Sequence, residues 1–268
     1  MPETFELLVK GYTVTEPVRI KQQGHVGVIE FSRPPVNYFD YEMMHAICDA
    51  ADELIDNHGS RALVLCSTGK HFCAGADFSG DGIGDNRVAV TDKIYGQAIR
   101  LFGVRAPIIA AIQGAAVGGG LGLACAADFR IGTPSSRLHS NFSALGFHPG
   151  FGLSVSLPQI LGHQKALEVF YTSPRLKGEE AYEIGLLDKL VEEDHLREEA
   201  IAFAQRIAQQ APLAVQSIKA TLRGDMPERV REVLERERAE QARLWATQDS
   251  DEGIAAARER RTPEFTGN

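Results

Sequence analysis

Two glycine-containing turns, each following a continuous apolar run, constrain the fold of this 268-residue chain more than any other feature. The first turn spans residues 69–77 and follows the run 62–66, and the second spans residues 113–122 and follows the run 108–112. Short apolar runs bounded by turns are typical of buried strands. Glycine lets the main chain turn sharply and lets other groups approach the backbone closely. The sequence therefore predicts buried strands that open into tight turns.

Helical periodicity alternates with strand patterns through the first half of the chain. Apolar side chains recur at helical spacing in residues 41–58 and 91–104, and a short apolar helix is expected at 119–127. A hairpin is expected at residues 18–32 and a further strand at 129–132. This alternation predicts an α/β architecture with repeated right-handed crossovers.

The second half of the chain is mainly helical. Short helices are expected at 153–161, 163–172 and 178–184 with a last strand at 187–191, and longer helices follow at 196–211, 213–223, 227–247 and 249–261. We therefore divide the chain into a core, residues 1–195, and a C-terminal helical region, residues 196–268. Glutamate and arginine alternate at 228–243, as is typical of a solvated helix face whose apolar positions pack on the core or on a second subunit. Residues 78–86 are rich in glycine and aspartate, which favours a mobile loop or lid.

Composition excludes several functions. The net charge of −8 argues against non-specific nucleic-acid binding, which needs many basic side chains. We expect no membrane span, because no run of 18 apolar residues occurs, and no secretory signal, because a basic segment followed by a long apolar run is missing at the start. The four cysteines are scattered without a C-x-x-C pair, so we expect reduced, buried thiols in a cytoplasmic protein and no metal site.

The glycine turns also favour a chemical function. Glycines that open a helix leave amide N–H groups unpaired, with the positive end of the helix dipole behind them. Two such turns side by side can hold one carbonyl oxygen and stabilise an enolate as it forms. The alternative is tight packing of helix on strand with no ligand. The spacing matches neither the dinucleotide-binding motif nor the phosphate-binding loop.

The chain resembles the crotonase superfamily, which contains the enoyl-CoA hydratases and isomerases. Residues 72–77 are similar to the first oxyanion segment of that family, and residues 112–124 are similar to the second. Further matching segments at 127–130, 145–152 and 181–188 occur in family order. The similarity extends over residues 18–265, nearly the whole chain.

The resemblance implies a spiral of ββα turns followed by helices that build a trimer, often a dimer of trimers. It implies an acyl-CoA thioester as the ligand, with no cofactor besides that CoA. By motif position, the amides of Ala76 and Gly119 would hold the thioester oxygen, and the main chain at Ala74 would lie beside the CoA adenine. The resemblance places three further glycines in the substrate-binding segments (Gly75, Gly118 and Gly120). It also assigns a CoA contact to Phe265 and the nearby Arg260 and Arg261, although these arginines better suit a solvated helix end.

The resemblance fails at the family's two catalytic glutamates. Gly122 and Phe142 stand at these positions, and neither side chain can move a proton. Hydration by the usual pair of carboxylates is therefore not expected, and Phe142 becomes a candidate for the acyl pocket. We consider three other proton carriers, each of which also has a structural interpretation as a brace or cap (His148, His139 and Asp77).

The sequence thus leaves three hypotheses open. The first is an enzyme that stabilises a thioester enolate during isomerisation, hydration, hydrolysis, retro-Claisen cleavage or decarboxylation. The second is a catalytically silent acyl-CoA-binding subunit. The third is an oligomeric scaffold that binds no thioester.

Overall fold

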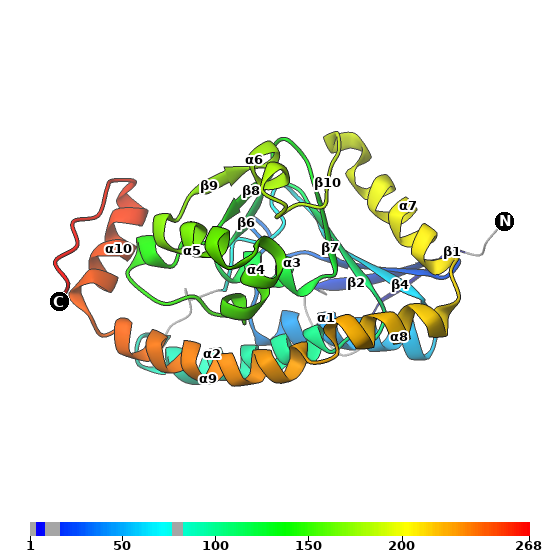
Figure 1. Cartoon of the computed structure of the whole chain (residues 1–268), viewed down its shortest axis with the longest axis horizontal. Helices are drawn as coiled ribbons and strands as arrows, with labels where there is room; N and C mark the ends of the chain where they lie inside the picture. Colours follow the sequence, from blue (N-terminus) through cyan, green and yellow to red (C-terminus); the bar gives the residue numbers. More distant parts are fainter. Residues whose placement is uncertain (1–3, 9–16, 77–82) are drawn as a thin grey trace.

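A seven-stranded sheet forms the centre of the computed structural model, which describes residues 4–8, 17–76 and 83–268 (Figure 1). The strand order is β1-β2-β3-β4-β5-β7-β10. The first three strands are antiparallel, and β3, β4, β5, β7 and β10 run parallel. The strands are β1 (Thr4–Leu8), β2 (Val18–Gln23), β3 (Val26–Phe31), β4 (Ala62–Ser67), β5 (Ile108–Ile112), β7 (Phe129–Gly132) and β10 (Lys189–Leu190).

A second sheet has three short strands. Strand β8 (Arg137–His139) lies between β6 (Ala115–Val117), to which it is parallel, and β9 (Arg175–Lys177), to which it is antiparallel. Three residues are too few to show a period of two, so the sequence pattern did not predict these strands.

Ten helices occur in the described part of the chain. They are α1 (Tyr41–Asp56), α2 (Ile83–Phe102), α3 (Gly119–Ala126), α4 (Leu153–Leu161), α5 (His163–Thr172), α6 (Gly178–Glu183), α7 (Leu196–Ala208), α8 (Pro212–Arg223), α9 (Met226–Leu244) and α10 (Gln248–Glu259). The mixed α/β fold with C-terminal helices is as predicted. No helix among the described residues has the length and the apolar character that crossing a membrane requires.

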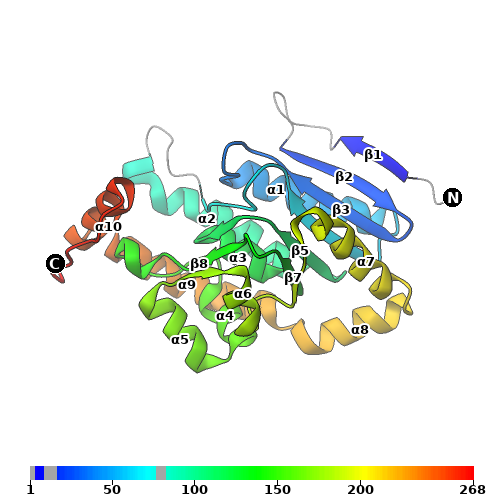
Figure 2. The same cartoon turned by 90° about the horizontal axis from the view of Figure 1, so that it is seen from above.

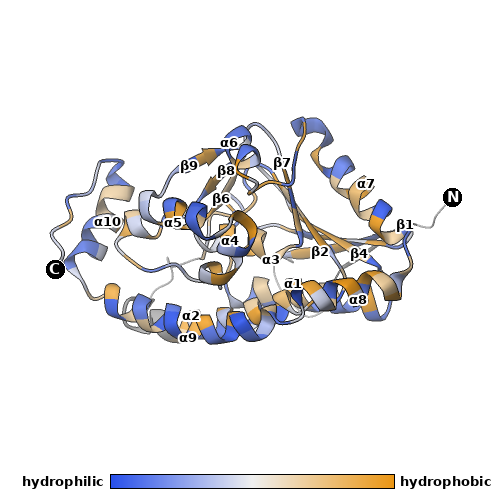
Figure 3. Cartoon of the chain, in the orientation of Figure 1, coloured by the Kyte–Doolittle hydropathy of each residue, from blue (hydrophilic) through white to orange (hydrophobic). Residues whose placement is uncertain are grey.

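Both faces of the large sheet are covered. Successive side chains of a strand point to opposite faces, so Leu63 and Leu65 of β4 join the core around α1, while Val64 and Cys66 pack with α7. The central strands β4 and β5 are accordingly buried along their whole length and largely apolar (Figure 3). Helix α1 begins at Asp40, whose carboxylate accepts a hydrogen bond from the Met43 amide at 2.9 Å.

Helix α2 begins eight residues earlier than the predicted start at residue 91. Part of the segment predicted to be a loop, residues 83–86, is therefore helical, and the remainder, residues 78–82, lies outside the described residues. The glycine and polar residues of this first turn concealed the helical period. The long helices α2 and α9 lie side by side (Figures 1 and 2), and together they bring distant parts of the chain to the site described below.

Candidate functional site

Backbone hydrogen bonds join the two glycine turns. The Cys73 amide donates to the Ala115 carbonyl at 2.9 Å, and the Val117 amide donates to the Cys73 carbonyl at 3.0 Å. Cys73 and Ala116 form a parallel bridge between them. The two turns, at residues 69–77 and 113–122, therefore lie side by side.

Two glycines make this close approach possible. Gly75 has a φ of 108°, which residues with a side chain rarely adopt. A Cβ atom on Gly120 would lie 2.1 Å from the Cys73 carbonyl oxygen. Any larger residue at position 120 would push the turns apart.

The amides of Ala76 and Gly119 lie close together. A Cβ atom on Gly119 would be 3.6 Å from the Ala76 nitrogen, and one on Gly75 would be 3.7 Å from the Gly119 nitrogen. Gly119 opens α3, where the first amides have no partner within the helix. Within the described parts of the chain, no acceptor is hydrogen-bonded to either amide. Both residues line one cavity of about 230 Å³.

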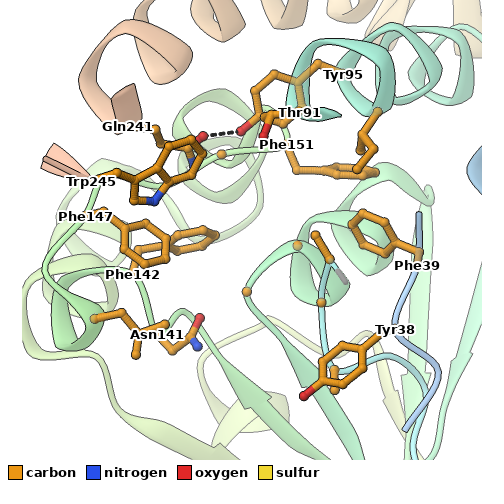
Figure 4. A pocket seen from close by; sticks show the side chains of 18 residues that line it. Tyr38, Phe39, Thr91, Tyr95, Asn141, Phe142, Phe147, Phe151, Gln241 and Trp245 are labelled. Atoms are coloured by element: carbon orange, nitrogen blue, oxygen red, sulfur yellow. Dashed lines mark hydrogen bonds between the residues drawn. The ribbon is translucent and has the colours of Figure 1, made fainter. Parts of the chain in front are cut away.

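The walls of this cavity are largely aromatic (Figure 4). Phe142, Phe147 and Trp245 lie along one side, with ring centroids 5.9 Å apart in both neighbouring pairs. Phe39 lies on another side, with its ring 5.5 Å from that of Phe151. Aromatic contacts of this kind contribute more stability than the burial of the ring surface alone.

One end of the cavity is polar. The Tyr95 hydroxyl donates to Gln241 Oε1 at 2.6 Å, and Gln241 Nε2 donates to the His148 carbonyl at 3.0 Å. Burial, together with the nearby Glu237 carboxylate, raises the pKa of Tyr95, so this phenol stays protonated. Tyr95 comes from α2 and Gln241 from α9, so the pair also ties the two helices together.

Gly122 and Phe142 are the residues that the resemblance predicts at the positions of the family's two glutamates. A Cβ atom on Gly122 would lie 2.6 Å from Cβ of Phe151, so the Phe151 side chain fills the space at this point. Phe142 lines the cavity and is only 6% exposed. None of the described residues lining the cavity carries a carboxylate or an imidazole.

Neither of the two predicted histidines is among the described residues that line the cavity. His148 Nδ1 is 2.8 Å from the Pro149 carbonyl, and the ring is not among the described lining groups. His139 Nε2 lies 3.0 Å from Ser173 Oγ, and burial lowers the pKa of His139. Asp77, which follows Ala76 in the chain, lies outside the described residues.

The remaining predicted binding residues divide into two groups. Ala74, Gly75 and Gly118 line the cavity with Ala76 and Gly119, whereas Gly120 packs on Cys73 beneath it. Phe265 is 44% exposed and lies in the C-terminal segment. This segment is held to α10 by a hydrogen bond that the Thr266 amide donates to the Asp249 carboxylate at 2.7 Å. In the single chain, Phe265 does not line the cavity.

The environment of the cysteine thiols does not activate them as nucleophiles. All four cysteines are free and buried. Burial raises the pKa of Cys73, the cysteine in the first turn, to about 12, so its thiolate is not populated near neutral pH. Among the described residues, no group of three His, Cys, Asp or Glu side chains could hold a metal ion.

The C-terminal helix α9 supplies lining residues that the sequence prediction missed. Its buried side chains include Leu234, Glu237 and Gln241 at helical spacing, so the buried face continues into polar residues. The Glu237 carboxylate accepts hydrogen bonds from the Gly152 and Ser154 amides at 2.8 and 2.9 Å. Burial raises the pKa of Glu237 to about 7. In the sequence, the signal for this wall of the cavity was that Glu237 and Gln241 continue the otherwise apolar stripe of α9.

Comparisons with known proteins agree with this architecture. The profile of the enoyl-CoA hydratase/isomerase family matches residues 21–268. A probable enoyl-CoA hydratase of Mycobacterium bovis is 32% identical over 252 residues, which cover 94% of this chain and 98% of that protein. A crotonyl-CoA hydratase of Syntrophomonas wolfei is 30% identical over 257 residues, covering 93% and 98% of the two chains.

A solved structure shows the same fold. The enoyl-CoA hydratase/isomerase of Pseudoalteromonas atlantica superposes with a TM-score of 0.82 at 26% identity and covers 93% of this chain and 100% of its own. Family profile, relatives and fold thus agree over nearly the whole chain. The chain belongs to the enoyl-CoA hydratase/isomerase family of the crotonase superfamily.

Proposed function

We propose that the protein is an acyl-CoA enzyme in which the amides of Ala76 and Gly119 bind the thioester oxygen and stabilise an enolate. The observation that carries this proposal is a pair of amides that lie close together at one cavity and have no acceptor among the described residues. In such a site, fixed donors act on the developing negative charge more strongly than water does. The names of the relatives, which include a crotonyl-CoA hydratase, support a CoA thioester as ligand.

The reaction is one that passes through an enolate without the usual pair of glutamates. Isomerisation, retro-Claisen cleavage and decarboxylation meet this condition, as does hydration with another acid and base. Hydrolysis would instead place the oxyanion of a tetrahedral intermediate on the same two amides. Incubation with a panel of saturated acyl-CoAs in D₂O tests the proposal, because an enolate exchanges its α-proton for deuterium. Exchange with any member of the panel is the expected result. Tight binding with no exchange would refute enolate formation.

His148, His139 and Asp77 remain our proposed proton carriers. His148 is the candidate whose chain segment adjoins the pocket residues Phe147 and Gly150. The variant His148→Ala should lower the exchange rate at least tenfold with little change in acyl-CoA affinity. His163→Ala, at an exposed position of α5, is the matched control. An unchanged rate in His148→Ala would remove this residue from the mechanism.

A catalytically silent acyl-CoA-binding subunit is the second candidate function. It is favoured by the absence of carboxylates and imidazoles from the described lining of the cavity. Calorimetry decides between the two candidates when combined with the exchange assay, because the silent subunit binds a thioester without turning it over. Failure to bind CoA or any acyl-CoA would instead favour a scaffold without a thioester ligand.

We also propose a homotrimer or a dimer of trimers. Helix α8 exposes the large apolar side chains of Leu213, Ile218 and Leu222, with exposed fractions of 78%, 59% and 68%. Exposed apolar surface of this kind marks interaction sites. Light scattering should give a mass of three or six chains, and Leu222→Glu should lower it whereas Tyr182→Glu on α6 should not. A monomeric wild type would contradict the proposal.

We propose that the protein needs no cofactor besides the CoA of its substrate and that it works in the cytoplasm. Four free, buried cysteines support a reducing compartment. Dialysis against a chelator should leave the exchange rate unchanged, and a loss of rate that a metal ion restores would contradict the first proposal.

A further inference from the structure

The cavity has an open end and a buried end. Tyr38 is 42% exposed, whereas Tyr95 is 8% exposed and Gln241 3% exposed. Figure 4 shows Tyr38 far from the Tyr95–Gln241 hydrogen bond, at opposite ends of the group of lining side chains. The amides lie near Phe39, because a Cβ atom on Gly119 would be 2.7 Å from Cζ of that ring. A thioester bound to the amides therefore directs its acyl group toward the buried end.

The buried end has hydrogen-bonding capacity left over. Gln241 uses one N–H for the His148 carbonyl and one lone pair for the Tyr95 hydroxyl. A glutamine side chain has two N–H groups and two carbonyl lone pairs, so these bonds leave one of each. Tyr95, Gly150 and Gln241 all line the cavity. A Cβ atom on Gly150 would lie 2.2 Å from Tyr95 Oη and 2.5 Å from Gln241 Nε2, so any side chain at position 150 would displace these two polar groups.

A purely hydrocarbon acyl group would remove water from this polar end and replace no hydrogen bond. Leaving a buried donor or acceptor unsatisfied weakens binding more than a typical hydrogen bond strengthens it. A hydroxyl group can accept from the free N–H of Gln241 and donate to its oxygen. The polar end therefore fits an acyl group whose tip carries a hydroxyl.

The middle of the cavity fits a flat ring. An apolar cavity of about 150 Å³ is known to bind benzene, so the 230 Å³ here accommodates one ring and a short linker to the thioester. The rings of Phe142 and Phe147 stand at 80° to each other, and those of Phe147 and Trp245 stand at 65°. An aromatic ligand finds both faces and edges to pack on. A flexible alkyl chain would lose more conformational freedom in the same space.

We propose that the site takes the CoA thioester of a compact hydroxyaryl acid, with the ring among Phe142, Phe147 and Trp245 and the hydroxyl at Tyr95 and Gln241. The inference rests on the proposed function, since it requires the thioester carbonyl at Ala76 and Gly119. Tyr95 and Gln241 are positioned as specificity-determining residues, which bind the tip of the acyl group rather than the reacting carbons.

Calorimetry on the full chain tests the proposal with four probes. These are 3-(4-hydroxyphenyl)propanoyl-CoA, 3-phenylpropanoyl-CoA, hexanoyl-CoA and CoA alone, of which none has a double bond to hydrate. We expect the hydroxyphenyl thioester to bind about tenfold more tightly than the phenyl thioester, as one additional hydrogen bond predicts. The phenyl thioester should in turn bind more tightly than hexanoyl-CoA.

The double variant Tyr95→Phe/Gln241→Leu removes both polar partners and keeps similar shapes, a change that stability often tolerates. It should reduce the tenfold preference to about one and raise the affinity for 3-phenylpropanoyl-CoA, because the hydrocarbon ring no longer buries an unsatisfied amide. If Tyr95 and Gln241 had only a structural role, the double variant would bind both aryl thioesters more weakly, and by the same factor. Tyr171→Phe, which removes a phenol hydroxyl at a 75% exposed position, is the control and should keep the preference.

The outcomes separate this inference from the proposed function. Hexanoyl-CoA binding as tightly as either aryl thioester would overturn the inference while the proposed function stands. A tenfold preference that persists in the double variant would likewise overturn the role of Tyr95 and Gln241. Failure of every thioester to bind would overturn the proposed function itself.

Discussion

Replacing Gly119 by proline removes one amide donor from the candidate site. Gly119 is the first residue of α3, where proline is well tolerated because its missing N–H has no partner in the helix. The cost in packing comes from the added carbon atoms, since a Cβ atom would lie 2.7 Å from Cζ of the buried Phe39. Gly119→Ala adds the same Cβ atom and keeps the N–H group, so it is the matched control.

The two variants should differ in rate rather than in stability. Crowding of Phe39 should lower the free energy of unfolding by about 1–3 kcal/mol in both. The proline variant should lose a further factor of about 10²–10³ in α-proton exchange, because one missing donor raises the barrier by about 2.7–4 kcal/mol in a measured case. The assay is exchange of a saturated acyl-CoA in D₂O, followed by NMR. Equal rates for the proline and alanine variants would refute the role of this amide.

Three further predictions concern stability and packing. Burial raises the pKa of Glu237 in the folded protein to about 7 from an ordinary value of 4.5, so between these two values only the unfolded chain ionises this carboxyl. The free energy of unfolding of wild type relative to Glu237→Gln should therefore fall by about 3 kcal/mol from pH 4.5 to pH 7 in urea titrations. A constant difference between the two proteins would contradict this. Asp128→Ala removes the carboxylate that pairs with Lys219 and Arg223, two largely buried cations of α8, and should lower the free energy of unfolding by about 3 kcal/mol. An unchanged melting temperature would show that these ion pairs contribute nothing to stability. Gly122→Ala places a methyl group 2.6 Å from Cβ of Phe151 and should lower the free energy of unfolding by about 2 kcal/mol; full stability in the same urea assay would disprove the close packing.

The parts of the fold that the sequence predicted correctly depend on local patterns. Strand β4 is a continuous apolar run and helix α1 carries clear helical periodicity. The resemblance of the two glycine turns to the family's oxyanion segments pointed to Ala76 and Gly119. Strands β6, β8 and β9 have three residues each and show no period, so only the tertiary structure reveals them. The start of α2 was missed because Gly84, Asp85 and Asn86 in its first turn do not follow the apolar helical period.

The walls of the cavity were harder to predict, for a physical reason. Tyr95, Gln241 and Trp245 reach the cavity only because α2 and α9 lie side by side, and no local sequence signal fixes that packing. Gln241 belongs to a buried stripe of α9 that starts with apolar residues, which is a signal of burial but not of what the side chain faces.

The most direct test of the two-amide site measures the thioester carbonyl itself. Hexanoyl-CoA labelled with ¹³C at the carbonyl gives an infrared stretch that hydrogen bonds move to lower frequency, whether or not the protein turns the ligand over. When the ligand binds, we expect a stretch below its value in water and a smaller shift with Gly119→Pro than with Gly119→Ala. A bound stretch at the aqueous frequency, or equal shifts in the two variants, would contradict the binding of the carbonyl by Ala76 and Gly119.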